Sequence, residues 1–469
     1  MKKILMTLVL APVMVMAGES AAVTNACDAS HNPRPVGDFR RSSLPPGPRP
    51  TVNGYKWTYY VRNGAATIGS PRKVSRKNSE PVVSPKPTGH VTIPSMLDGY
   101  NVTCIGDSVF RNCGELTSVT IPEGLTTIGG CAFENCGKLT SVEIPSSVLN
   151  IGGGAFAGCD QLTSVKLPQG LKEIGFFAFK MCRKLTSLTI PKDVAKIGGE
   201  AFAGCTRIKH IEVDPSNRYF TSIDGVVYTK DRKELVVCPS GLSSVKILDG
   251  VTNIRVGAFS GCGGLTALEL PNSVTNIGQA AFSGCPFATI ALPQGLRGIG
   301  GGAFYGCAAL SSITIPDSVT FIGDIAFDHC SDLTSVTMRG VCPISSTNAF
   351  HKCNKLMTIH VPANSKDWAG KKEWLGVPLV FDGDPLDPLK EKELIDAVQK
   401  RQAEVLAQQE RVKAQLEAQQ KLLKARREAE RAEQKKKLQE IQGKLKRVRA
   451  EKSKQEKSPQ SNSTNDKAK

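Results

Sequence analysis

A repeat of about 23 residues runs through the middle of the chain and constrains its fold more than any other feature. An Ile, usually followed by Gly, recurs at this interval; a Phe follows it by five residues, and a Cys follows the Phe by three. The Phe residues are Phe110, Phe133, Phe156, Phe179, Phe202, Phe259, Phe282, Phe304, Phe327 and Phe350. A period of this length predicts a stack of similar units, because one unit alone cannot bury its own apolar residues.

Each unit contains one short strand and a second, shorter extended piece. In the pattern LTSVTIP, Leu116, Val119 and Ile121 have the spacing of a strand with one buried face. Pro122 then ends the strand, and Phe133 later supplies the largest apolar side chain of its coil. We expect neighbouring coils to share one continuous core, with their parallel strands about 4.8 Å apart.

The motif IGxxAFxxCxxLTSVxIPxxV resembles the BspA-like leucine-rich repeats of exported bacterial proteins and some eukaryotic microbial surfaces, and it covers about 105–362. The resemblance implies a gently curved solenoid with its short strands on the concave side. It also implies a surface or secreted binding module, of a class often linked to adhesion. The predicted fold is therefore a leucine-rich-repeat solenoid over 105–383, built of 23-residue coils with short parallel strands and followed by a long C-terminal α-helix.

The array is interrupted once. Ile197 and Ile254 are 57 residues apart, which is 34 more than one repeat. The extra segment contains two turn signals between apolar runs, at Asp224-Gly225 and at Lys230-Asp231. We expect a hairpin insert at 214–247 that projects from the solenoid as a candidate recognition element; the alternative is a variant coil that only packs.

The N-terminal flank has the features of an exported protein. Residues 1–17 combine two lysines, an apolar run and a small-residue cleavage site, which predicts a signal peptide, and no later run has the length of a membrane span. Residues 18–50 are expected to form a Pro-rich linker and 51–104 the strands of an N-terminal cap. The sequence before Cys27 matches a lipoprotein box poorly, so lipid anchoring is only a minor alternative. The expected location is the cell surface, the periplasm or the medium.

The C-terminal flank changes composition after the closing cap, which we place around Trp368 and Trp374. Residues 387–454 are rich in Ala, Gln, Glu, Lys and Leu and predict a long charged helix or a weak coiled coil. Glutamines interrupt its heptads, so self-association and a single helix that spaces or tethers the array both stay open. Residues 455–469 are expected to form a disordered tail.

The net charge of +17 is concentrated in the two flanks. Residues 28–90 carry +8 and residues 386–469 carry +9, whereas residues 91–385 carry about −1. Attraction to an anionic polymer would therefore act through the flanks. The alternative is that the charged side chains of the flanks are simply solvated and bind no partner. The sequence predicts no specific nucleic-acid partner.

Ten of the 15 cysteines occupy one position of the repeat: Cys113, Cys136, Cys159, Cys182, Cys205, Cys262, Cys285, Cys307, Cys330 and Cys353. Side chains at one repeat position point in parallel, which disfavours disulfides even at about 4.8 Å between coils. We expect a ladder of free, buried thiols that reach backbone carbonyl groups. A pair among the other five cysteines is possible.

The sequence gives little support for a metal-binding site or for an enzyme. His329 and His351 lie close to Cys330 and Cys353, but those cysteines belong to the ladder, so no metal site is predicted. The glycine triplet in IGGGAFAGC lacks the dinucleotide spacing, because Ala157 stands where a Gly is required, and no phosphate-loop lysine follows. With no nucleophile elbow or zinc-protease motif, we expect a protein that is not an enzyme and uses no cofactor.

The candidate ligand-binding residues are the solvent-facing positions of the strands on the concave face. They are Thr120, Glu143, Lys166, Thr189, Glu212, Thr314, Thr337 and His360. This row has no aromatic anchors, which favours weak contacts over a long face. We expect an exported protein that binds a protein or glycan on a host or neighbouring cell surface. The alternative is a structural envelope component whose basic C-terminal helix binds anionic polymers.

Overall fold

The computed structural model describes residues 50–69, 82–346, 348–384, 387–400 and scattered residues of 403–418. The chain divides into two compact units, Met1–Gln402 and Ala403–Lys469. All the repeats lie in the first unit. The predicted signal peptide, almost all of the linker, the tail and most of the long helix lie outside the described residues.

Most coils of the first unit contribute a first-column strand and, after a turn, a second-column strand, which is usually the shorter of the two. The first-column strands are β6 (Gly89–Thr92), β9 (Leu116–Thr120), β11 (Ser141–Glu143), β13 (Ser164–Lys166), β15 (Leu188–Ile190), β17 (Ile211–Val213), β21 (Ser244–Lys246), β23 (Ala267–Glu269), β26 (Ser312–Ile315), β28 (Ser335–Met338), β30 (Thr358–Pro362) and β32 (Val377–Gly383). The second-column strands are β8 (Tyr100–Ile105), β10 (Thr127–Ile128), β12 (Asn150–Ile151), β14 (Glu173–Ile174), β16 (Lys196–Ile197), β22 (Asn253–Ile254), β24 (Asn276–Ile277), β25 (Gly298–Ile299), β27 (Phe321–Ile322) and β29 (Ile344–Ser345).

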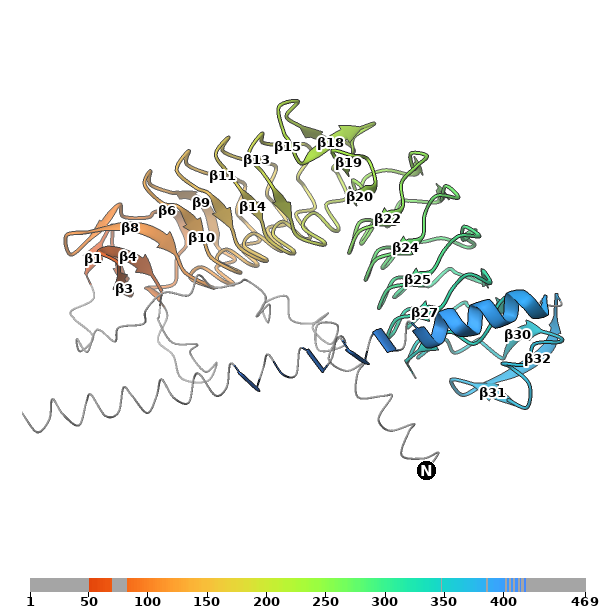
Figure 1. The fold of residues 1–469 in the computed structure, drawn as a ribbon. Coiled ribbons are helices and arrows are strands. Elements are labelled where there is room, and N and C mark those ends of the chain that lie inside the picture. The colour runs from red at the N-terminus through yellow and green to blue at the C-terminus, as the bar shows by residue number, and fades with distance from the viewer. Residues whose placement is uncertain are drawn as a thin grey trace, which may run out of the picture. The chain divides into compact units, whose positions relative to one another are not determined.

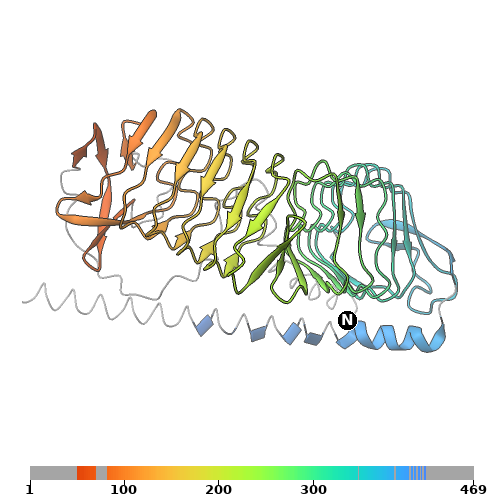
Figure 2. The same cartoon turned by 90° about the horizontal axis from the view of Figure 1, so that it is seen from above.

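Within each sheet of a column, neighbouring strands pair in parallel and in register with the repeat. Val142 of β11 lies opposite Val119 and Val165, one coil away on either side, and Ile151 of β12 lies opposite Ile128 and Ile174. Figure 1 shows the coils following one another through the first unit, and Figure 2 shows the same succession from above. The predicted solenoid with short parallel strands is thus confirmed.

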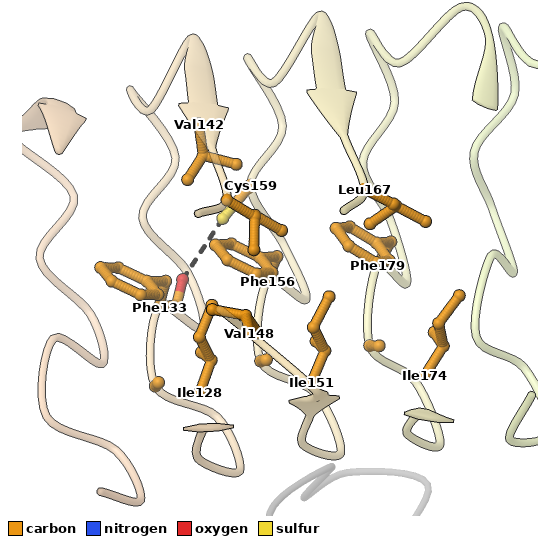
Figure 3. Packing of buried hydrophobic residues seen from close by; sticks show 14 of the residues in the cluster. Ile128, Phe133, Val142, Val148, Ile151, Phe156, Cys159, Leu167, Ile174 and Phe179 are labelled. Carbon is orange, nitrogen blue, oxygen red and sulfur yellow. Dashed lines mark hydrogen bonds between the residues drawn. The ribbon is translucent and has the colours of Figure 1, made fainter. Parts of the chain in front are cut away.

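The Phe of each coil lies at the centre of the core. The rings from Phe110 to Phe202 form a parallel stack, with centroids 4.9–5.7 Å apart and interplanar angles of 2–7°. A second stack runs from Phe259 to Phe350. Figure 3 shows three rings of the first stack between the isoleucines of the second column and the apolar side chains of the first. Burial of these rings and of the aliphatic residues around them is the main favourable contribution to the stability of the coils.

The array begins about one coil earlier than the sequence analysis placed it. β6 pairs in parallel with β9, and β8 with β10, so residues 89–105 form a coil instead of belonging to a cap. The hairpin of β3 (Tyr59–Arg62) and β4 (Ala65–Ile68) extends the second column, because β4 pairs in parallel with β8. The remaining N-terminal strands are β1 (Thr51–Val52), β2 (Tyr55–Trp57), β5 (Val83–Ser84) and β7 (Met96–Leu97).

The insert forms a hairpin, but it does not project as predicted. β18 (Phe220–Ile223) and β19 (Val226–Thr229) are antiparallel, and β19 continues into β20 (Glu234–Val237), which pairs in parallel with β22. Val227 packs into the core of the preceding coils, whereas Val226 and Tyr228 pack into the core of the following coils. β19 and β20 are therefore largely buried on both faces between two cores, because their apolar runs supply side chains to each side.

One coil after the insert lacks a first-column strand. Ile277 and Ile299 are 22 residues apart, and the missing residue lies between Cys285 and Pro293. No strand forms there, so the first column is interrupted between β23 and β26, while the second column continues from β24 to β25. The loss of one residue thus prevents strand pairing in the first column of this coil but leaves the pairing of its second column intact.

The last coil is closed by β31 (Glu373–Trp374), which pairs antiparallel with β32. Trp368 is fully buried, and its indole N–H donates to the carbonyl oxygen of Gly340 at 2.8 Å. A helix then begins at 388 and continues to 400, at the end of the first unit. Among the described residues, no helical segment has the length and hydropathy of a membrane span.

Candidate binding surfaces

The strand face consists of the outward side chains of the first-column strands: Thr120, Glu143, Lys166, Thr189, Glu212, Thr314, Thr337 and His360. Six of them are exposed, and Thr337 and His360 are half-buried. Parallel pairing places Glu143 beside Lys166, Thr189 beside Glu212, and Thr337 between Thr314 and His360. The structure therefore brings these residues into rows, in separate blocks of paired strands.

Histidines lie near both ends of this face. Nδ1 of His90 is 2.8 Å from Oγ of Ser118, and its Nε2 is 3.3 Å from Oγ1 of Thr120. At the other end, Nδ1 of His360 is 2.8 Å from a carboxylate oxygen of Asp382. The sequence analysis missed His90, because it assigned this strand to the cap. The chemistry of the face is that of hydroxyl, carboxylate and imidazole groups, which suits hydrogen bonding and ion pairing.

The ten cysteines of the repeat are free thiols buried in the core. From Cys136 onward, the thiol of each one except Cys262 donates to the carbonyl oxygen of the Phe in the preceding coil, at 3.0–3.3 Å. One such bond, from Cys159 to Phe133, is drawn in Figure 3. Burial raises the pKa of Cys159 and of Cys307 to about 12. These thiols therefore stay protonated near neutral pH, which makes them poor nucleophiles and poor metal ligands.

The cysteines outside the row behave in two ways. Cys104, Cys238 and Cys342 are free thiols, and burial raises the pKa of Cys342 to about 12. Cys131 is disulfide-bonded, whereas the other thirteen described cysteines are free. Cys27 lies outside the described residues. Cys131 lies between Ile128 and Phe133 and not at the repeat position of the ten cysteines, so its disulfide involves none of the thiols in the row.

The segment from the Ile to the Cys of each coil, called the turn segment here, has two left-handed positions. One is the third residue after the Ile, where Phe177 and Ile325 have φ values of 59° and 48°. The other is the residue before the Cys, where Asn135 and Met181 have φ values of 59° and 63°. Gly and Asn occupy such positions at low cost, whereas bulky or β-branched residues are strained there. The sequence analysis recognised a turn here but neither of these positions.

Apolar side chains are exposed on two of the turn segments. Phe176, Met181 and Val256 are 46%, 39% and 39% exposed, although they are large hydrophobic residues. The positions equivalent to Phe176 carry Asp, Gly or Gln in most other coils. The sequence shows the unusual Phe176 in the variant IGFFAF. It does not show that this side chain is exposed, because the residue type at this position varies from coil to coil. These residues are the largest departure from the polar character of the turn segments.

The histidines considered for metal binding lie around one buried carboxylate. Nδ1 of His329 and Nδ1 of His351 are 2.9 and 3.1 Å from Oδ1 of Asp328, which is 5% exposed. The thiols of Cys330 and Cys353 instead point to carbonyl oxygens of the core. Within the described part of the chain, no group of three or more His, Cys, Asp or Glu side chains is arranged to hold a metal ion.

Several solved structures are similar to this chain. A leucine-rich cell surface protein from Faecalibacterium prausnitzii is 29% identical, covering 68% of this chain and 96% of that one, with a TM-score of 0.44. A leucine-rich repeat protein from Bacteroides ovatus is 25% identical over 70% of this chain and 98% of that one, with a TM-score of 0.39. The pneumococcal vaccine antigen PcpA is 23% identical over 75% of this chain and 95% of that one, with a TM-score of 0.54, and shares the fold.

The comparison with protein families gives the assignment. No curated protein matches the chain significantly. The model of the BspA type leucine rich repeat region matches in six copies over residues 91–223 and 238–369, which is more than half of the chain. The gap between the two matched stretches coincides with β19 and β20 of the insert. The chain therefore belongs to the BspA-type leucine-rich repeat family.

Proposed function

We propose that this protein is exported and, without catalysing a reaction, binds a protein or glycan ligand at a cell surface through its solenoid. The observation that carries the proposal is the strand face, where exposed polar side chains repeat in register from coil to coil. Membership of a leucine-rich repeat family supports protein binding as the general role. The F. prausnitzii relative, described as a cell surface protein, supports the location.

The chemistry of the strand face favours many weak contacts. Glu143 and Lys166 lie side by side on neighbouring strands, and Glu212 lies beside Thr189 with 3.2 Å between the carboxylate and the hydroxyl group. Exposed pairs of this kind contribute little individually. A ligand that spans several coils can add such contacts, and attachment of the array at a surface would raise its effective concentration.

The test is a binding screen of the full chain against host matrix proteins and glycans by surface plasmon resonance. The charge reversals Glu143→Lys, Lys166→Glu and Glu212→Lys should weaken binding of a captured ligand at least tenfold. Lys192→Glu, an exposed charge reversal outside the strand face, is the matched control. If the three reversals leave the affinity unchanged, the strand face is not the binding surface.

A second function is favoured by the distribution of charge. Residues 386–469 carry +9, whereas 91–385 carry about −1, so an anionic envelope polymer would be held by the C-terminal flank, with the array as a spacer. A chain ending at Gln402 retains the first compact unit and removes all of this net charge, because residues 386–402 are neutral overall. Loss of every interaction in that variant, with its circular dichroism spectrum retained, would favour this second function over the first.

A further inference from the structure

The exposed apolar side chains of the turn segments lie on coils that flank the same coil, that of Gly199. A Cβ built on Gly199 would lie 2.7 Å from Cγ1 of Val256, so the valine side chain covers this glycine. Phe176 occupies the equivalent position in the coil before Gly199, and Val256 occupies it in the coil after. Phe177 is half-buried beside Phe176, and Met181 ends the same turn segment. We call Phe176, Phe177, Met181 and Val256 the turn surface.

Two of these residues stand where the backbone disfavours them. Phe177 and Met181 have φ values of 59° and 63°, in the left-handed region. The residues equivalent to Met181 in the first two complete coils after β8 are Asn112 and Asn135, which tolerate this conformation. A methionine here therefore lowers stability and leaves an apolar side chain in water. Strain and exposure together at one place are typical of a binding surface more than of a packing requirement.

Two cationic side chains, Lys180 and Arg183, lie beside the turn surface. Nζ of Lys180 lies 4.7 Å from the ring centroid of Phe177, and Nη2 of Arg183 lies 3.8 Å from Sδ of Met181. Both cations also contact acidic residues of neighbouring coils, Glu200 at 2.7 Å and Asp160 at 3.2 Å. The cations are therefore held in place beside the apolar groups while remaining partly exposed.

The net charge of the array changes sign at these coils. Residues 172–260, which contain the turn surface, carry +5, whereas residues 91–171 carry −4 and residues 261–385 carry −2. A positive region between two negative ones attracts an acidic partner and repels a basic one. An interaction hot spot usually has apolar groups at its centre and a polar or charged rim that complements the partner.

We propose that the turn surface is a docking site for an acidic protein segment that carries apolar side chains, with Phe176 and Met181 as its anchors and Lys180 and Arg183 as its rim. This proposal rests on the proposed binding function and moves its specific contact from the strand face to the turn segments. The strand face then supplies the additional weak contacts. The partner is a polypeptide and not an anionic polymer, because a phosphate or sulfate chain has no apolar groups for Phe176 and Met181.

Two substitutions remove the anchors while leaving the coil intact. Phe176→Gln places the residue that Gln279 supplies at the same position of another coil, and Met181→Asn places the residue found at Asn112 and Asn135. Because Asn relieves the left-handed strain, Met181→Asn should leave the melting temperature unchanged or higher. Met357→Ser removes a different side chain, which is 72% exposed, and serves as the control.

The experiment selects random 16-residue peptides displayed on phage against the full wild-type chain, with the Phe176→Gln, Met181→Asn double variant as the counter-selection. We expect enriched peptides with net negative charge and several Phe, Leu or Trp residues. Synthetic copies should bind the double variant at least tenfold more weakly than the wild type and bind Met357→Ser as the wild type. Their binding should also weaken when NaCl rises from about 0.1 to 0.5 M, because salt screens the cationic rim.

The other outcomes separate this proposal from the proposed function. Enriched peptides that bind wild type and double variant equally would overturn the turn surface as the docking site while leaving a binding protein. Basic or uncharged peptides that depend on Phe176 and Met181 would overturn the acidic partner. No enrichment at all, with a folded chain on the beads, would count against both the docking site and peptide binding as the function.

Discussion

The Gly that follows the Ile of most coils lies where the backbones of two coils almost touch. A Cβ on Gly175 would be 2.5 Å from the backbone nitrogen of Gly153, and a Cβ on Gly198 would be 2.3 Å from that of Phe176. At the coil after the insert Arg255 replaces this Gly, and its guanidinium binds Glu234 at 2.6 Å. The glycine is therefore kept by lack of space between coils, and an Arg is tolerated where the stacking geometry changes.

Gly175→Ala should lower the free energy of unfolding by about 1–3 kcal/mol, because the methyl group would force two coils apart. Gly137→Ala is the matched control, since a Cβ at Gly137 meets nothing within 4 Å. Urea denaturation followed by circular dichroism measures both variants. Equal stabilities for the two variants would contradict the close approach of the coils.

Titration of the denatured, unreduced chain should find free thiols at the thirteen described cysteines that are free, and none at Cys131, which is disulfide-bonded. Cys131→Ser should therefore raise the thiol count by one, and peptide mapping under non-reducing conditions should lose one cross-linked pair. A count well below ten would instead mean that thiols of the buried row are paired.

Much of this residue-level detail could be predicted from the repeat. The period places Phe133 and Cys159 in equivalent environments along the array, because each coil repeats the contacts of the one before it. The period does not indicate that Phe177 or Ile325 has a positive φ, since this position has a positive φ in nine coils and is occupied in them by seven different residue types. The exposure of Phe176 could not be predicted either, because it depends on how much of its side chain the residues of both neighbouring coils cover.

At the scale of single elements, the hairpin of the insert shows that turn signals predict a hairpin but not whether its strands are buried. Asp224-Gly225 marks the turn between β18 and β19 as expected. The runs VVY and ELVV, however, place apolar side chains on both faces of β19 and β20, which is typical of strands covered on both sides. A projecting hairpin would have polar residues on one face. The composition of the strands, more than the turns, therefore carried the information about burial.

The start of the helix at 388 depends on one buried carboxylate. Glu391 is 4% exposed and accepts hydrogen bonds from the Ser365 hydroxyl group and from the backbone N–H groups of Lys366 and Asp367. Burial by itself raises the pKa of Glu391, but the three hydrogen bonds outweigh burial, and the net pKa is lower than that of a free Glu. The charged carboxylate is thus the form that holds the helix.

Acid should therefore loosen the helix. A carboxyl group whose pKa is lower in the folded state stabilises it above the unfolded pKa of about 4.3, and the contribution is lost as the pH falls through the folded pKa. Hydrogen exchange at residues 388–400 should accelerate below about pH 4 relative to that of the solenoid. Glu391→Gln should show fast exchange already at pH 7, and exchange in this variant that stays slow would contradict the anchoring role.

At the scale of the whole first unit, the insert divides the core in two. The ring stack ends at Phe202 and begins again at Phe259, and the buried residues form two clusters that meet at the hairpin. Each coil in such an array is stabilised mainly by its neighbours. Continuity of the solenoid could be predicted from its period, but the division into two cores could not, because the sequence does not show which faces of the insert are buried.

The two cores should respond separately to mutation. Phe133→Ala, in the first core, should cost about 3–5 kcal/mol and lower the protection of coils before the insert, while Phe304→Ala should act in the same way on the coils after it. Hydrogen exchange followed by mass spectrometry on both variants makes the comparison. A uniform loss of protection across both halves in either variant would mean that the hairpin couples the cores into one cooperative unit.

The thiol row, the ring stack and the paired strands all connect a coil to the coil one repeat away. A coil copied or deleted as a whole therefore leaves every type of contact at its boundaries unchanged, whereas the loss of a single residue removes a strand, as in the coil between Ile277 and Ile299. Recombination between the gene segments that encode coils would change the length of the array without the invention of a new interface. Such length variants would keep the turn surface intact as long as the crossover points lie outside 172–260.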